Sequence, residues 1–133
     1  MINNNCIYSN KKIPSNFYYA RLRRVETEKS NYEFPKVMAE IEILPQQGVR
    51  KGTVLYALIY PSAKAAKHFI NFKNTFPVWD NKINAPKTGQ IGSVWIYDSE
   101  YDGTRYSAVK FVYQSEKVRR KIRERYGGLG ERE

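Results

Sequence analysis

The sequence predicts a mainly β domain of five strands, with a helix between the third and fourth strands and a basic helix near the C-terminus. Five segments alternate apolar and polar residues with a period of two, which is typical of half-buried strands. After the third segment the period changes to that of an amphipathic helix. The dipeptide Asp102-Gly103 separates the last two segments and strongly favours a hairpin turn. The chain has 133 residues, enough for one domain with a real core.

The predicted elements follow the chain in a fixed order: strands at 17–27, 34–44 and 53–60, a helix at 62–74, and strands at 93–101 and 106–113. The third strand shows the alternation, because Leu55, Ala57 and Ile59 point to one face and the residues between them to the other. Ser62 is expected to cap the helix. Residues 77–92 are rich in Pro, Asn, Lys and Gly and are expected to form a long connection.

Three regions are expected along the chain. Residues 1–15 form a flexible lead-in, residues 16–114 the barrel domain, and residues 115–133 a basic helix with a disordered end. The helix has one narrow apolar stripe, made by Val118, Ile122 and Tyr126. This stripe could dock on the barrel or on a second copy of the chain, so a homo-oligomer stays open.

The charge of the chain favours a polyanionic partner. It has 23 Lys and Arg against 13 Asp and Glu, a net charge of +10 and a pI of about 9.7. Nucleic acid and an anionic membrane surface both fit this balance, and a generically basic protein is the alternative. No apolar run is long enough to span a bilayer. Residues 1–10 lack the apolar core of a secretory signal, so a cytoplasmic protein is expected.

An enzyme or a metalloprotein is not expected. Cys6 and His68 are the only Cys and His residues, which excludes a disulfide framework and a multi-histidine metal site. Glu40 and Glu42 share one face of the second strand, but no nucleophile motif accompanies them. They are expected to balance nearby Lys and Arg charges. The loop at 88–92 lacks the Lys-Ser/Thr of a phosphate cradle, so no cofactor is expected.

Aromatic and basic residues occupy the outward sides of the predicted strands. Rings beside guanidinium groups on one side of a sheet are what stacking on unpaired bases requires, and each stacked base is worth about 1–3 kcal/mol. The alternative is that these rings pack under the helix or the long connection. The candidate stacking residues are Tyr19, Tyr56, Tyr60, Trp95 and Tyr97. The candidate phosphate contacts are Arg21, Arg23, Arg24, Arg50, Lys51, Arg105 and Lys110.

Three strands, a helix and a two-stranded hairpin are similar in order to the OB-fold, a five-stranded Greek-key barrel. More narrowly, the aromatic and Arg-rich first strand and the entry Gly52-Thr53 into the third strand resemble small phage or mobile-element single-stranded-DNA-binding proteins. The resemblance implies binding on the face of the second and third strands, between rim loops at 28–33 and 102–105. Bacterial single-strand-binding proteins commonly end in an acidic tip that recruits repair partners. This chain ends Leu129-Gly130-Glu131-Arg132-Glu133 after a basic helix, so the resemblance does not extend to that recruitment role.

The sequence therefore predicts an OB-fold domain that binds single-stranded nucleic acid with little sequence preference, DNA in preference to RNA. The predicted role is to protect or organise single strands in DNA replication or recombination. Two alternatives remain open: an RNA-binding OB protein, and a protein–protein interaction module whose charge is incidental. Salt dependence separates binding to a strand from an apolar protein contact.

Overall fold

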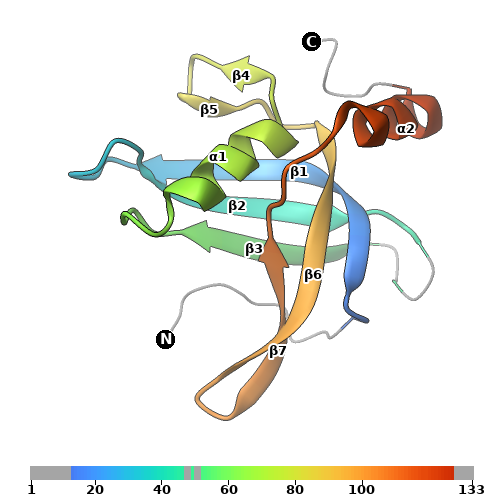
Figure 1. Ribbon diagram of the computed structural model, residues 1–133, viewed down its shortest axis with the longest axis horizontal. Helices are drawn as coiled ribbons and strands as arrows, with labels where there is room; N and C mark the ends of the chain where they lie inside the picture. Colours follow the sequence, from blue (N-terminus) through green and yellow to red (C-terminus); the bar gives the residue numbers. More distant parts are fainter. Residues whose placement is uncertain (1–12, 47–48, 50–51, 128–133) are drawn as a thin grey trace.

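The computed structural model describes residues 13–46, 49 and 52–127, and its main feature is a strongly curled antiparallel sheet (Figure 1). Five strands form this half-barrel in the order β3-β2-β1-β6-β7. They are β1 (Asn16–Glu28), β2 (Lys36–Ile43), β3 (Thr53–Ile59), β6 (Ile91–Tyr101) and β7 (Thr104–Lys110). A small separate sheet contains β4 (Trp79–Asp80) and β5 (Ala85–Pro86), and the helices are α1 (Ala66–Thr75) and α2 (Glu116–Tyr126). The predicted mainly β fold is confirmed.

The alternation of apolar and polar residues in the sequence corresponds to the alternation of buried and partly buried residues in the sheet. Every second residue of β2 is buried, from Val37 to Ile43, and the residues between them are only partly buried. The buried side chains fill the concave side of the sheet, where α1 covers them with Phe72 and, just after its last turn, Phe76 (Figure 1). Asp102 and Gly103 both have positive φ, 53° and 81°, as a type I′ hairpin turn requires.

Helix α1 begins later than predicted and packs unusually close to β6. Ser62 does not cap it; the Ser62 hydroxyl accepts a hydrogen bond from the Ala65 N–H in a turn before the helix. At the other end of α1, Thr75 lies against Gly92 of β6. A Cβ atom on Gly92 would lie 2.5 Å from Cγ2 of Thr75 and 2.9 Å from its carbonyl oxygen. Glycine is therefore what allows helix and strand to approach here.

The connection between α1 and β6 is more ordered than predicted. This connection contains the β4–β5 hairpin, and the side chain of Gln90 holds it in place through hydrogen bonds. The buried Gln90 side chain donates to the carbonyls of Val78 and Lys87 and accepts from the Val78 N–H. Strands of two residues leave no periodicity in the sequence, which explains why the alternation pattern does not reveal this hairpin.

Both ends of the described chain pack on the half-barrel. In the predicted lead-in, Ile13 is buried in the core and its N–H donates to the Ser107 hydroxyl, while residues 1–12 lie outside the described part. At the other end, α2 begins at the N-cap Ser115 and ends at Gly127. Its buried Ile122 contacts Leu44 and Ile91 on the outer side of the sheet. The apolar stripe of α2 was expected to dock either on the barrel or on a second copy of the chain. In the structure it packs on the barrel of its own chain.

No helix in the described ranges has the length and apolar character that crossing a membrane requires.

Candidate nucleic-acid interface

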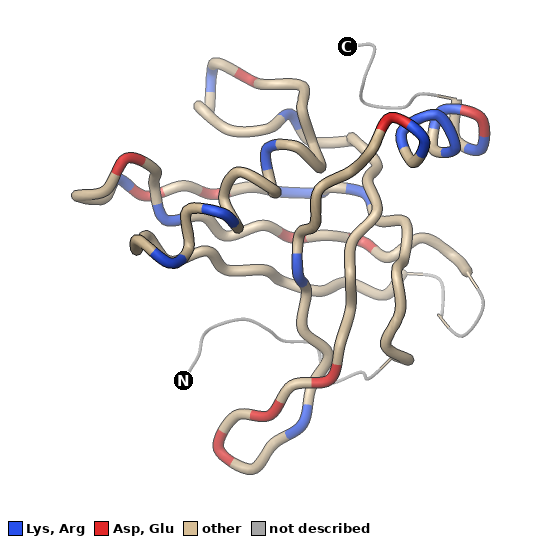
Figure 2. Tube along the Cα trace, viewed as in Figure 1, with Lys and Arg blue, Asp and Glu red and all other residues tan. Residues whose placement is uncertain are grey.

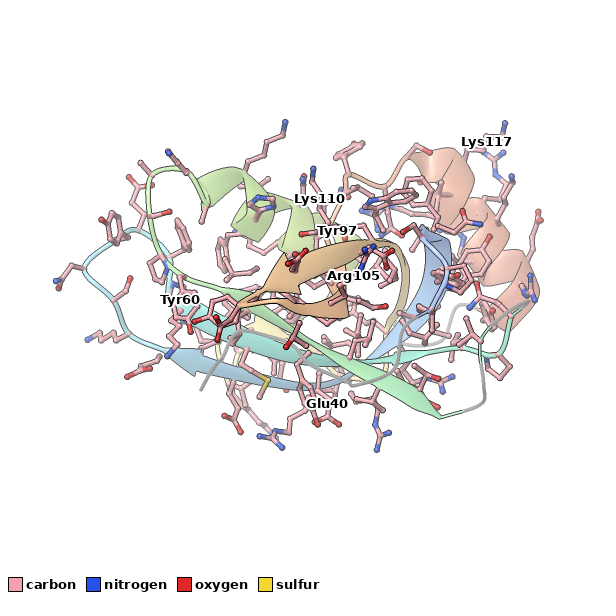
Figure 3. All side chains as sticks on the ribbon, turned by 90° about the horizontal axis from the view of Figure 1, so that it is seen from below. Glu40, Tyr60, Tyr97, Arg105, Lys110 and Lys117 are labelled. Atoms are coloured by element: carbon pink, nitrogen blue, oxygen red, sulfur yellow. The ribbon has the colours of Figure 1, made fainter. Side chains whose placement is uncertain are left out.

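The curl of the sheet divides the predicted site residues between two outer surfaces. We call the surface formed by Phe17, Trp95, Tyr97 and Lys110 the β1–β6–β7 face. We call the surface formed by the outward residues of β2, β3 and the second half of β1 the β2–β3 face. In Figure 3, Glu40 of the β2–β3 face points away from α1, whereas Tyr97 and Lys110 lie on the side of the sheet where α1 is drawn.

A row of two aromatic rings and one cation crosses the β1–β6–β7 face. Trp95 in β6 stands opposite Phe17 in β1 and opposite Lys110 in β7. The Phe17 and Trp95 rings are tilted by 59° with their centroids 4.9 Å apart. Phe17 is 54% exposed. The structure thus brings the predicted Trp95, Tyr97 and Lys110 together and adds Phe17. Phe17 could have been found from the sequence, because it is two residues before Tyr19 and shares its side of the strand.

Two hollows flank this row. The first, which we call the β3–β7 groove, has a volume of about 480 Å³ and lies between the free edges of β3 and β7. Trp95, Tyr97 and Lys110 line it together with His68 of α1. The second, which we call the α2 groove, has a volume of about 450 Å³. Its described lining residues are Phe17, Tyr18, Tyr19, Gln46, Ser93, Val112, Tyr113, Gln114, Val118 and Lys121.

Tyr19 belongs partly to the contact between α2 and the sheet. The Tyr19 and Tyr126 rings pack edge to face with their centroids 5.6 Å apart. The Arg125 guanidinium lies 5.6 Å from the centroid of the Tyr19 ring. Burial among these side chains raises the pKa of the Tyr126 hydroxyl above its usual value. Tyr19 therefore supports α2 as well as lining the α2 groove.

Carboxylates accompany the cations of the β2–β3 face. Glu40 lies 3.8 Å from both Arg23 and Arg24, and Lys36 lies 3.5 Å from Glu28. Arg21 stands opposite Glu42. The charges on this face therefore compensate each other, and phosphate gains little attraction there.

Two of the predicted stacking residues lie among these charges: Tyr56 in β3 and Tyr60, which directly follows β3. Tyr56 is opposite Glu40 and is 39% exposed. Tyr60 is exposed, and the Lys36 ammonium lies 5.3 Å from its ring centroid. Both rings are accessible on the β2–β3 face, but the structure does not bring them into the row of Phe17 and Trp95.

The tip of the β6–β7 hairpin is acidic. The resemblance to single-stranded-DNA-binding proteins implied that this tip forms one rim of the binding site. The tip carries Asp98, Glu100 and Asp102 (Figure 2). Arg105 forms an ion pair with Asp98 at 3.3 Å and stands opposite Glu100. Arg105 is therefore on the other side of the hairpin from Tyr97. The predicted contacts Arg50 and Lys51 lie outside the described residues.

Positive charge gathers instead on α2 and around α1 (Figure 2). Some of the α2 cations are engaged within the protein. Arg119 donates to the Asn74 carbonyl at 2.6 Å, and Arg123 pairs with Glu116 at 2.6 Å. The hydrogen bond and positive charge of Arg123 lower the pKa of the Glu116 carboxyl. Lys117, Lys121 and Arg125 are spaced four residues apart and so lie on one side of the helix.

Comparison with known proteins finds no matching family model and no similar curated protein. Within residues 13–46, 49 and 52–127, no group of three or more His, Cys, Asp or Glu side chains is placed to hold a metal ion.

Proposed function

We propose that this chain is an OB-type barrel that binds single-stranded DNA with little sequence preference, and that the strand crosses the β1–β6–β7 face. The row Phe17–Trp95–Lys110 carries the proposal, because it sets the exposed Phe17 ring and the partly buried Trp95 ring beside a cation. Every base has a π-face, so stacking on such rings tolerates any sequence. Protecting or organising single strands during replication or recombination is a role that needs this tolerance.

The strand order supports an OB-type barrel. The first strand lies in the middle of the sheet, the helix follows the third strand, and the last two strands form a hairpin. The free edges of β3 and β7 approach each other across the opening. The OB-fold is likewise a five-stranded and partly open barrel.

Electrostatics favours the β1–β6–β7 face over the β2–β3 face that the sequence resemblance implied. On the β2–β3 face a phosphate would meet Glu40, Glu42 and Glu28 beside the cations that these residues neutralise. On the β1–β6–β7 face it would meet Lys110 and, at the α2 groove, Lys121. Like charges at close range cost energy that stacking must then overcome.

Fluorescence anisotropy with labelled oligonucleotides of equal length tests this function. We expect oligo(dT) to bind more tightly than duplex, and its affinity to fall steeply as salt rises because phosphate contacts release counterions. Tighter binding of oligo(rU) would make the protein an RNA-binding one. A failure of all three nucleic acids to bind would favour the protein–protein interaction module and refute the proposal.

Two alanine variants distinguish the faces. Trp95→Ala should weaken oligo(dT) binding about 5- to 150-fold, as expected for about 1–3 kcal/mol of lost stacking. Tyr56→Ala removes a more exposed ring from the β2–β3 face and should nevertheless have a smaller effect. A larger loss for Tyr56→Ala would show that the strand follows the β2–β3 face. Thermal melts of both variants test whether the substitutions disturb the fold.

A further inference from the structure

We propose that the α2 groove is a pocket for one unpaired nucleotide of the bound strand, with the base against Phe17 and Tyr113 and the phosphate at Lys121. This inference rests on the proposed function and adds a site to it. The groove is about 450 Å³, within the range of roughly 300–1,000 Å³ in which small-molecule sites fall.

Two of the rings that line the groove, Phe17 and Tyr113, are unusually accessible for their size. Phe17 is 54% exposed and Tyr113 is 72% exposed, although both stand next to well-packed strands. They come from different segments, the start of β1 and the chain between β7 and α2. Flat apolar rings left in water beside a hollow are what a base needs for stacking.

The backbone that carries Tyr113 is held in place before any ligand binds. The neighbouring Gln114 is buried; its N–H donates to the Asn74 side chain at 2.6 Å, and its own side-chain amide donates to the Thr75 carbonyl at 3.1 Å. Its side-chain oxygen accepts from the Ser93 N–H. On the other side, Asn71 donates to the Phe111 carbonyl at 3.2 Å. A ring on such a fixed segment loses little freedom on binding, which favours affinity.

The charge of the groove fits an anion. Among its described lining residues, Lys121 is the one with a charged side chain, and no carboxylate stands among them. Lys117 and Arg125 continue the same side of α2 by one turn in each direction. A strand that leaves the groove along α2 would therefore keep its phosphates near cations.

The two side-chain amides of the groove, on Gln46 and Gln114, are occupied by the protein itself. The Gln46 amide oxygen accepts from the Tyr19 N–H at 2.9 Å, and its amide nitrogen donates to the Tyr19 and Leu44 carbonyls. Gln114 is engaged in the same manner. Neither amide is available to read the edge of a base, and recognition rests on ring stacking and charge. The pocket should accept all four bases.

Two variants of the groove and two matched controls test the pocket with fluorescein-labelled oligo(dT). Tyr113→Ala should weaken binding about 5- to 150-fold, the range for removal of one base–ring stack. Lys121→Ala should weaken it and reduce the slope of log affinity against log salt by about 0.7, as expected for one phosphate contact on a single strand. The controls are Tyr32→Ala, which removes an exposed ring from the β1–β2 loop, and Lys82→Ala, which removes a charge near β4. Both should bind within about twofold of the parent protein, a change below the smallest stacking effect.

The outcomes separate the pocket from the function. If the parent protein binds oligo(dT) and both groove variants bind as well as the controls, the pocket is refuted and the proposed function stands. If Tyr32→Ala weakens binding more than Tyr113→Ala, the strand uses the β1–β2 loop and the pocket is again refuted. If the parent protein does not bind oligo(dT), the proposed function fails and the pocket fails with it. Because Tyr113 is exposed, its variant should melt at the parent temperature.

Discussion

Replacing Ile122 with alanine should release helix α2 while the half-barrel stays folded. Ile122 is 2% exposed and contacts Leu44 and Ile91 in a cluster separate from the main core. The substitution removes three carbons, and at about 0.8 kcal/mol for each the loss is about 2.4 kcal/mol before any cavity cost. The hydrogen bond from Arg119 to the Asn74 carbonyl is the main polar anchor that remains, and such charged bonds contribute about 1.5–3 kcal/mol.

Amide hydrogen exchange measures this release directly. A loss of about 2.4 kcal/mol corresponds to about 50-fold less protection for residues 116–126. Amides of β1 and β2 should keep their protection, since α2 adds nothing to the main core. Ile70→Ala makes the same chemical change on α1, where Ile70 is 60% exposed, and should leave protection unchanged. Unaltered exchange in α2, or an equal loss throughout the sheet, would refute the reasoning.

Two further predictions concern the packing of the helices. Gly92→Ala should lower the free energy of unfolding by about 1–3 kcal/mol in urea titrations, because the new Cβ would overlap Thr75; an unchanged midpoint would contradict the close approach of α1 and β6. Deletion of the chain after Gln114 should leave a folded half-barrel by circular dichroism and reduce the salt slope of oligo(dT) binding by about 0.7 for each phosphate that α2 binds in the full chain. An unfolded truncation would show that α2 is needed for the fold.

The strands could be predicted because one physical constraint, burial of one face, acts on every second residue. This is visible in β2, where each residue from Val37 to Ile43 alternates as the sequence suggests. The β4–β5 hairpin could not be predicted in this way. It depends on the buried Gln90 side chain, whose partners Val78 and Lys87 no local pattern identifies.

Alternation also indicated which rings point outward, but it could not show which outward rings are neighbours. That depends on strand order and register. The order β3-β2-β1-β6-β7 sets Trp95 beside Phe17 and Lys110, and sets Tyr56 beside Glu40 on another surface. The position of α2 likewise depends on tertiary contacts. Only when α2 is docked on the sheet do Tyr113 and Lys121 line the same groove.

The fluorescence of Trp95 provides the most direct test of binding on the β1–β6–β7 face. The chain has 2 tryptophans, and the other, Trp79, lies in β4 and lines neither groove. Trp79→Phe keeps an aromatic ring there and leaves Trp95 as the single reporter. We expect oligo(dT) to quench Trp95 along the same binding curve that anisotropy gives, with duplex of equal length quenching it less. Oligo(dT) that binds by anisotropy while Trp95 fluorescence stays constant would contradict stacking on this face.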